Sequence, residues 1–131
     1  MKIEKLKDLL KDFGDKVKFD YDLKKMNWFN IGGKTKAFYK ADNLKDLVIF
    51  LKKLKNDEKI FILGAGSNTL ITDKIYDGVV IKLSNNFNNI SLLSEDIIIA
   101  GSAVLDKALS VFAMNNELSG FEFLTGIPGT I

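Results

Sequence analysis

At residues 60–68 the chain reads Ile60-Phe61-Ile62-Leu63-Gly64-Ala65-Gly66-Ser67-Asn68, a short apolar run followed directly by a glycine loop. The apolar run predicts a buried strand, flanked by helices, that ends at Gly64. Without Cβ atoms, Gly64 and Gly66 allow the backbone to approach a ligand closely and to direct consecutive N–H groups at it. Ser67 and Asn68 add a hydroxyl and an amide. The loop therefore suits a pyrophosphate group.

Two familiar phosphate-binding motifs do not fit this loop. A dinucleotide fingerprint needs a third glycine, where this chain has Thr69, and a helix that begins there. A P-loop needs Gly-Lys-Ser or Gly-Lys-Thr, which the sequence does not contain. A plain tight turn, which needs glycine only for its backbone angles, remains the alternative to a pyrophosphate site.

The segments around the loop predict an α+β fold. A strand and a helix before the apolar run would form a βαβ unit with a right-handed crossover, and a more antiparallel part would follow it. The predicted elements are an amphipathic helix over 3–13 that ends at Gly14 and packs onto the protein, a strand over 34–41, a helix over 44–54 with Asp42 or Asn43 as N-cap, strands at 60–63, 79–83, 90–93 and 97–100, and a helix over 104–115.

Composition limits the classes of protein that this chain can belong to. With 131 residues, 47% hydrophobic and 27% charged, it fits one ordinary domain with a real core. No apolar run approaches the roughly 20 residues that span a bilayer, so no membrane partner is expected. The charged amino terminus does not resemble a signal peptide, so the expected location is the cytoplasm.

The amino-acid types that the sequence lacks exclude several kinds of chemistry. The sequence has no Cys and no His, so neither a metal site nor a thiol nucleophile is expected. All 19 basic residues are Lys, and the net charge of +2 is spread without a basic block, which argues against a nucleic-acid partner. Anions would have to be bound by backbone amides, hydroxyls, Asn and Lys.

A second loop lies at the end of the chain, at Leu124-Thr125-Gly126-Ile127-Pro128-Gly129-Thr130. The single proline stands between two glycines, which indicates a rigid turn. A plain turn is again the alternative. The apolar residues here predict that the chain is cut short within a domain and self-associates through this stretch. These residues are Phe121, Phe123, Leu124, Ile127 and Ile131.

Three segments together resemble the UDP-N-acetylenolpyruvoylglucosamine reductase family: Asn27 to Gly33, Leu63 to Asn68, and Leu118 to Thr130. The chain departs from the family at two positions. Trp28 stands where the family usually has Thr. Glu117 stands where the family often has Gly, so Asn115 or Asn116 is expected to supply the left-handed cap of the preceding helix.

The resemblance implies a two-subdomain FAD-binding fold of the vanillyl-alcohol-oxidase/PCMH type. The first α/β subdomain would cover about 1–83, and about 84–131 would begin a second, incomplete subdomain, with no substrate domain. On this assignment, valine at Gly64 or Gly66 should weaken FAD binding far more than folding. The resemblance places the FAD pyrophosphate on Gly64, Ala65, Gly66, Ser67 and Asn68, and a second turn along the flavin and pyrophosphate at Gly126, Ile127, Pro128, Gly129 and Thr130.

The activity that the resemblance implies is the NADPH-dependent reduction of UDP-N-acetylglucosamine enolpyruvate to UDP-N-acetylmuramate, a step of peptidoglycan synthesis. The family's catalytic arginine, serine and glutamate would lie beyond Ile131. No catalytic residue is therefore assigned, and this chain alone is expected to be inactive. The alternatives are a non-catalytic FAD- or nucleotide-binding module, such as a gene remnant, and a structural adaptor.

Overall fold

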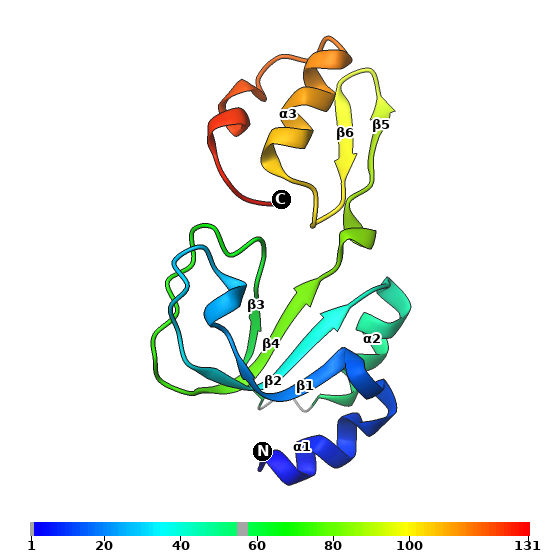
Figure 1. Ribbon diagram of the computed structural model, residues 1–131. Helices are drawn as coiled ribbons and strands as arrows, with labels where there is room; N and C mark the ends of the chain where they lie inside the picture. Colours follow the sequence, from blue (N-terminus) through cyan, green and yellow to red (C-terminus); the bar gives the residue numbers. More distant parts are fainter. Residues whose placement is uncertain (1, 55–57) are drawn as a thin grey trace.

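A four-stranded mixed sheet forms the larger part of the molecule (Figure 1). The computed structural model describes residues 2–54 and 58–131. The strands lie in the order β1 (Val17–Asp22), β2 (Lys34–Ala41), β4 (Tyr76–Leu83) and β3 (Ile60–Ile62). Strand β1 is antiparallel to β2, whereas β2 and β3 both run parallel to β4.

Helices cover one face of this sheet and loops cover the other. The helical side carries α1 (Ile3–Leu10), a 3-10 segment η1 (Lys11–Lys16) and α2 (Leu44–Lys53). Helix α2 begins where Asn43 Oδ1 accepts a hydrogen bond from the Asp46 N–H at 2.8 Å, which confirms the predicted N-cap. The buried side chains on this face are Leu6, Leu10, Val17, Ala37, Tyr39, Ala41, Phe50, Leu54, Val79 and Ile81.

The amino-terminal helix is shorter than its apolar spacing predicts. The α-helix ends at Leu10, and 3-10 turns continue the chain to Lys16. Within those turns Gly14 adopts φ +53°, a left-handed conformation that glycine reaches without steric cost. The predicted α-helix over 3–13 is therefore too long by about one turn. Gly14 interrupts the 3-10 turns that follow the helix.

Strand β3 is an edge strand, and the prediction of a buried strand is wrong. It pairs only with β4, and Ile60, Phe61 and Ile62 are 41%, 40% and 60% exposed. The connection from β2 to β3, which contains α2, skips one position in the sheet, and β4 later fills that position. An apolar run indicates that a strand is suited to burial. Whether the strand is buried depends on which elements pack against its two faces.

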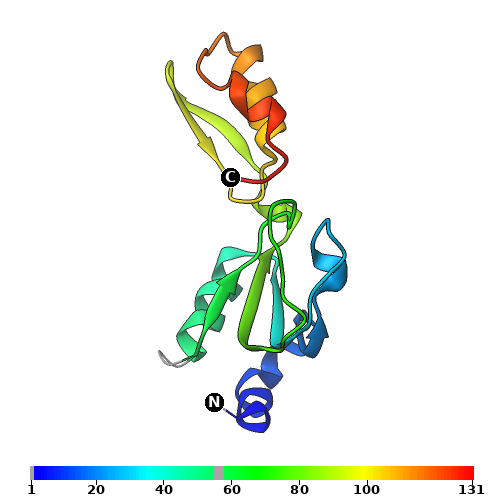
Figure 2. The ribbon, with the colours of Figure 1, turned by 90° about the vertical axis from the view of Figure 1, so that its left-hand side faces the viewer.

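The remainder of the chain forms a smaller unit beyond the end of β4 (Figure 2). A short 3-10 turn, η3 (Asn85–Phe87), leads into an antiparallel hairpin of β5 (Ile90–Ser94) and β6 (Ile97–Ala100). Helix α3 (Asp106–Asn115) and the 3-10 segment η4 (Glu122–Gly126) follow. These bounds agree with the predicted strands and helix to within a few residues.

The cap of α3 differs from the prediction. Glu117 takes the left-handed conformation with φ +59°, whereas Asn116 has φ −108°. The Leu118 N–H donates to the Ala113 carbonyl at 2.9 Å, and the Glu117 N–H donates to the Met114 carbonyl at 3.1 Å. These two bonds form a Schellman cap, which requires the residue after the helix cap to be left-handed. Position 117 must adopt that conformation even though it is not glycine.

Among the described residues, no helix is long and apolar enough to cross a membrane.

Candidate functional site

The two glycine loops meet in space. The Ser67 hydroxyl donates a hydrogen bond to the Pro128 carbonyl oxygen at 2.5 Å. The Asn68 side-chain amide donates to the same oxygen at 2.8 Å. Two loops that the sequence indicates separately therefore form one structure.

The second loop is also fastened to the start of α3. Leu105 and Thr130 form an antiparallel bridge, with a hydrogen bond of 3.2 Å from the Asp106 N–H to the Gly129 carbonyl. A Cβ at Gly129 would lie 2.6 Å from Asp106 Oδ2, so a larger residue there would displace the Asp106 side chain. Helix α3 and the first loop together fix the position of the turn around Pro128.

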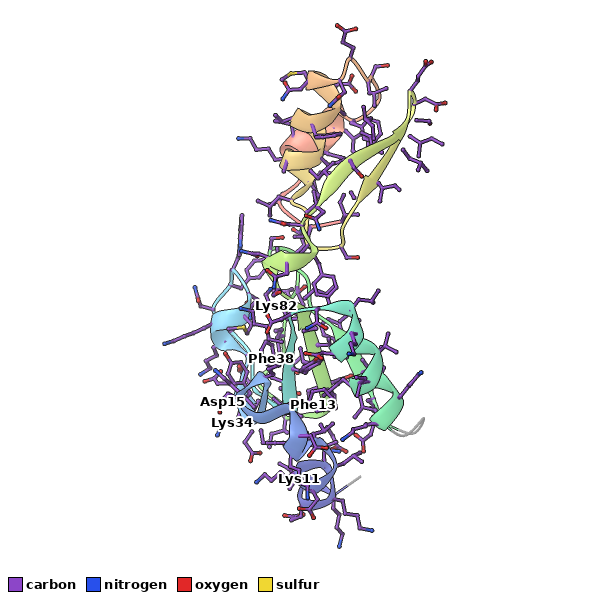
Figure 3. The ribbon with its side chains drawn as sticks, turned by 90° about the vertical axis from the view of Figure 1, so that its right-hand side faces the viewer. Lys11, Phe13, Asp15, Lys34, Phe38 and Lys82 are labelled. Atoms are coloured by element: carbon purple, nitrogen blue, oxygen red, sulfur yellow. The ribbon has the colours of Figure 1, made fainter. Side chains whose placement is uncertain are left out.

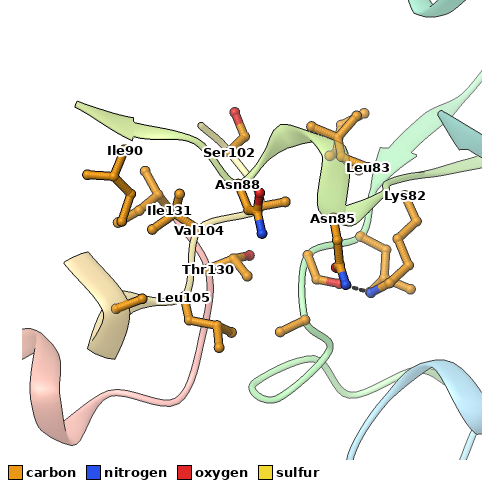
Figure 4. A pocket seen from close by; sticks show the side chains of 16 residues that line it. Lys82, Leu83, Asn85, Asn88, Ile90, Ser102, Val104, Leu105, Thr130 and Ile131 are labelled. Atoms are coloured by element: carbon orange, nitrogen blue, oxygen red, sulfur yellow. Dashed lines mark hydrogen bonds between the residues drawn. The ribbon is translucent and has the colours of Figure 1, made fainter. Parts of the chain in front are cut away.

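A cavity of about 560 Å³ lies where these segments meet the end of the four-stranded sheet. Figure 4 shows Thr130 and Ile131 on one wall, with Lys82 and Asn85 on the other. Its walls are mostly apolar, and the polar groups on them are hydroxyls, amides and one ammonium.

The structure divides the ten predicted site residues into three groups. Gly64, Ala65 and Thr130 line the cavity. Gly66 and Ser67 are buried behind it and hold the first loop in shape. The other five residues do not line the cavity, although Asn68, Pro128 and Gly129 make the hydrogen bonds that join the loops. The remaining members of this third group are Gly126 and Ile127.

The first loop presents backbone donors without acceptors. Within the described part of the chain, none of the N–H groups of residues 64–68 donates a hydrogen bond. Gly66 and Ser67 are nevertheless buried, and more than about 90% of buried backbone N–H groups in proteins are paired. Consecutive unpaired N–H groups form a cradle for an anionic oxygen. The loop therefore fits a phosphate group by its own geometry.

The two glycines of this loop have different reasons to be glycine. Gly66 adopts φ +75°, and a Cβ there would collide with the Met26 carbonyl oxygen. For Gly66 the turn itself is a sufficient explanation. A Cβ at Gly64 would instead lie 2.9 Å from Thr130 Oγ1, the side chain of a residue that lines the cavity. Gly64 is therefore the glycine that keeps the cavity wall open.

Lys82 is the site residue that sequence reasoning missed. Its Nζ donates a hydrogen bond to the Gly64 carbonyl, and its side chain lines the cavity. Burial lowers the pKa of the Lys82 ammonium below its ordinary value of 10.5, and the positive charge of Lys40 lowers it further. A lone lysine in the apolar run Val79-Val80-Ile81-Lys82-Leu83 was the signal that could have identified it.

The arrangement can bind an anion but offers little for acid–base chemistry. The described lining of the cavity contains no Asp or Glu side chain, and the sequence supplies no thiol or imidazole. Across the described residues there is also no group of three or more Asp or Glu side chains able to hold a metal ion. The site is therefore suited to holding a phosphate-bearing ligand in an otherwise apolar cavity.

Comparison with protein families gives one match over most of the chain. The model of a family described as FAD binding domain matches residues 35–131. That range includes both loops and Lys82. It begins within β2, so β1 and the amino-terminal helix lie outside the match.

Two curated proteins and one solved structure similar to this chain carry the printed name UDP-N-acetylenolpyruvoylglucosamine reductase, spelled slightly differently in the structure's title. The protein from Pelagibacter ubique is 63% identical over 131 residues, which is 100% of this chain and 43% of that protein. The protein from Rickettsia canadensis is 44% identical over 114 residues, or 87% of this chain and 38% of that one. A crystal structure of the protein from Thermus caldophilus has a TM-score of 0.65 at 25% identity, covering 87% of this chain and 38% of that chain. This chain thus spans less than half the length of these relatives.

Proposed function

The chain belongs to the FAD-binding domain family, and from that premise we propose that it is the FAD-binding part of a UDP-N-acetylenolpyruvoylglucosamine reductase. FAD is the cofactor of this domain. The observation that carries the proposal is the junction of the two loops, where unpaired N–H groups lie beside a cavity of about 560 Å³. The 63% identity to a protein of that name supports the choice of activity.

We assign the FAD pyrophosphate to the first loop, with the second loop beside it. The N–H groups of Gly64, Ala65, Gly66, Ser67 and Asn68 would donate to the phosphate oxygens. The turn of Gly126, Ile127, Pro128, Gly129 and Thr130 would hold that loop in place and close the wall of the cavity. Bound FAD would supply hydride transfer, while the residues of this chain bind and orient the cofactor.

We further propose that the two parts of the fold are separate subdomains, about 1–83 and about 84–131. The cavity lies where they adjoin, with Gly64, Ala65 and Lys82 from the first and Val104, Thr130 and Ile131 from the second. Ligand sites commonly form at such boundaries because each side can contribute different groups. A cofactor bound there would hold the two subdomains together.

The whole reaction requires groups that this chain does not supply. In the proposed enzyme NADPH is the electron donor and a UDP-sugar enolpyruvate is the substrate. The chain spans 43% and 38% of two relatives of that name, and the resemblance places the family's catalytic arginine, serine and glutamate beyond Ile131, so the proton donor and substrate-binding groups would come from polypeptide outside these 131 residues. The chain alone should therefore show no substrate-dependent oxidation of NADPH.

Two further expectations belong to this proposal. The proposed location is the cytoplasm, where nucleotide-sugar substrates and NADPH are available. Self-association is proposed through the end of the chain, because Phe123, Ile127 and Ile131 are 66%, 43% and 47% exposed. Sedimentation across a concentration series tests this, and a monomer at every concentration would contradict it.

The fluorescence of Trp28 tests cofactor binding directly. Trp28 is the single tryptophan, and its backbone N–H donates to the Gly66 carbonyl at 3.0 Å. FAD bound at the loop would place a flavin near the indole, which should quench its emission in a saturable way. The Trp28→Phe variant, followed by flavin fluorescence instead, controls for quenching by free FAD.

Riboflavin separates specific binding from general affinity for flavin. Because it lacks the pyrophosphate, riboflavin should bind much more weakly than FAD. If FAD produces no saturable quenching and no flavin remains with the protein on gel filtration, the proposed function is wrong.

A further inference from the structure

Lys82 occupies a particular place at the end of the sheet. It lies on β4 next to Lys40 of β2, at the end of the strand that faces the hairpin unit (Figure 3). Among the described residues that line the cavity it is the only one with a charged side chain. The single charged side chain on the described cavity wall is therefore positive.

In the part of the chain that the structure describes, the charge of Lys82 is not paired, although Lys82 also lines a second hollow that contains Asp15, Asp42, Lys16, Lys18 and Lys40. Its Nζ donates to the Gly64 carbonyl oxygen, which carries no formal charge. No carboxylate lies within ion-pair distance of Lys82 in residues 2–54 and 58–131. The side chain is partly buried, and its desolvation lowers the pKa. A partly buried ammonium without a counter-ion is unfavourable until an anion approaches it.

The hydrogen bond to Gly64 also fixes where that charge lies. An ammonium group has three N–H donors, so one bond to the Gly64 carbonyl leaves two available. Gly64 begins the loop whose N–H groups lack acceptors. The positive charge and the backbone donors are thus held on the same segment, beside the same cavity.

We propose that Lys82 is the cation that binds the FAD pyrophosphate, in a chain that has no arginine for this purpose. The inference rests on the proposed function. Lys82 would contribute a charge-assisted hydrogen bond to a phosphate oxygen while its contact with the Gly64 carbonyl keeps the loop against β4. It is a binding residue and takes no part in the chemical step.

A purely structural role makes a different prediction. If Lys82 only pins the loop to β4, its loss should alter folding without regard to the charge of the ligand. If it binds the pyrophosphate, its loss should weaken ligands that carry phosphates and should reduce the salt dependence of their binding.

The experiment compares Lys82→Met with Lys40→Met in the 131-residue chain. Methionine keeps most of the apolar stem and removes the charge, and Lys40 is an exposed neighbour that does not line the cavity. The dissociation constants of FAD, ADP and riboflavin are measured at two salt concentrations. Lys82→Met should weaken FAD and ADP by roughly 10–100-fold, the usual effect of a hydrogen bond to a charged group. Lys40→Met should change them by less than about 3-fold, as expected of an exposed charge.

Further variants at position 82 and the pH dependence of FAD affinity also test the role of Lys82. Lys82→Arg should retain most of the affinity because it keeps the charge. If circular dichroism shows Lys82→Met to be unfolded, Lys82→Gln replaces it, since glutamine also removes the charge but keeps a hydrogen-bond donor. In the parent, FAD affinity should fall as the pH rises toward the lowered pKa of Lys82, and this fall should be absent in Lys82→Met.

The results separate this inference from the proposed function. Equal FAD affinity in the parent and in folded Lys82→Met would overturn the inference and leave the proposed function intact. An equal loss of affinity for riboflavin and FAD would also overturn it, in favour of the structural role. A parent chain that binds neither FAD nor ADP would overturn the proposed function and this inference together.

Discussion

The Ser67 hydroxyl donates a hydrogen bond of 2.5 Å to the Pro128 carbonyl oxygen across 61 positions of sequence. Asn68 donates to the same oxygen, so one backbone carbonyl receives both side chains that end the first loop. The shape of the first loop therefore depends on a turn that the chain forms only at its far end. Cofactor affinity should be sensitive to either side of this junction.

The first prediction concerns this junction. Ser67→Ala and Asn68→Ala should each lower FAD affinity a few-fold, because each removes one hydrogen bond worth about 1 kcal/mol while the other remains. The double variant should lose more than the sum of the two, since the Pro128 carbonyl then has no side-chain donor. FAD titrations of the four proteins measure this, with Ser91→Ala on the exposed strand β5 as control. Strictly additive effects would contradict the shared role of the carbonyl.

The second prediction separates the two glycines of the first loop. Gly66→Ala should lower the free energy of unfolding by about 2 kcal/mol or more, because a left-handed residue with a Cβ costs about 1–2 kcal/mol before the collision with Met26 is counted. Gly64→Ala should largely preserve folding and weaken FAD binding, because its Cβ meets only the Thr130 side chain.

Gly126→Ala is the control for folding, since a Cβ there has no neighbour within 4 Å. Urea unfolding is measured for all three variants, and FAD titration for Gly64→Ala and Gly66→Ala with Ser91→Ala as control. The sequence predicts that substitution of either glycine weakens binding more than folding. From the structure we expect this only for Gly64. If Gly64→Ala binds FAD as the parent does, Gly64 does not line the cofactor site.

The third prediction uses a buried hydroxyl in the core. Tyr39 is fully buried and stacks on Phe50 at 3.9 Å between ring centroids, and its hydroxyl has no hydrogen-bond partner among the described residues. Tyr39→Phe should therefore leave stability at neutral pH unchanged or raise it by about 1 kcal/mol. A loss of 2 kcal/mol or more in urea unfolding would show that the hydroxyl has a stabilising partner.

Tyr39→Phe should also change how the free energy of unfolding depends on pH in the alkaline range. Burial, together with the negative charges of Asp46 and Asp42, raises the pKa of Tyr39 from 10.0 to about 12. Between these values the unfolded chain releases the Tyr39 proton and the folded chain retains it. The stability of the parent should therefore fall as pH rises through this window, and Tyr39→Phe should lose less. Tyr21→Phe, at a partly exposed tyrosine, controls for removal of a hydroxyl.

The fourth prediction concerns the cap of α3. Glu117→Gly should stabilise the protein by about 0.5–1 kcal/mol, because relief of the left-handed strain outweighs the greater entropy of glycine in the unfolded chain. Asn116→Gly should have the opposite sign, because Asn116 is not left-handed and its side chain donates to the Phe112 carbonyl at 2.8 Å. Thermal unfolding of both variants provides the comparison, and equal shifts would contradict the Schellman assignment.

Most of the elements could be predicted from local sequence. The strand at 34–41 matches β2, and the helix from Leu44 begins at its Asn43 cap. The hairpin lies where short apolar runs predict strands, and α3 lies where helical spacing predicts a helix. The strand at 17–22 was missed, although its alternation of Val17, Phe19 and Tyr21 with charged residues was a period-2 signal. Such patterns are readable because hydrogen bonding and side-chain periodicity act over a few residues.

The residue types alone indicate that residues 64–68 form a glycine loop able to approach an anion, and that no thiol, imidazole or guanidinium could assist it. Three features become visible only in the folded molecule: Ser67 reaches Pro128, Gly64 and Thr130 share a cavity with Lys82, and β3 lies at an edge of the sheet. The physical reason is that these contacts join segments far apart in the chain. Their positions follow from how the sheet and the hairpin unit pack together, and local spacing does not record that packing.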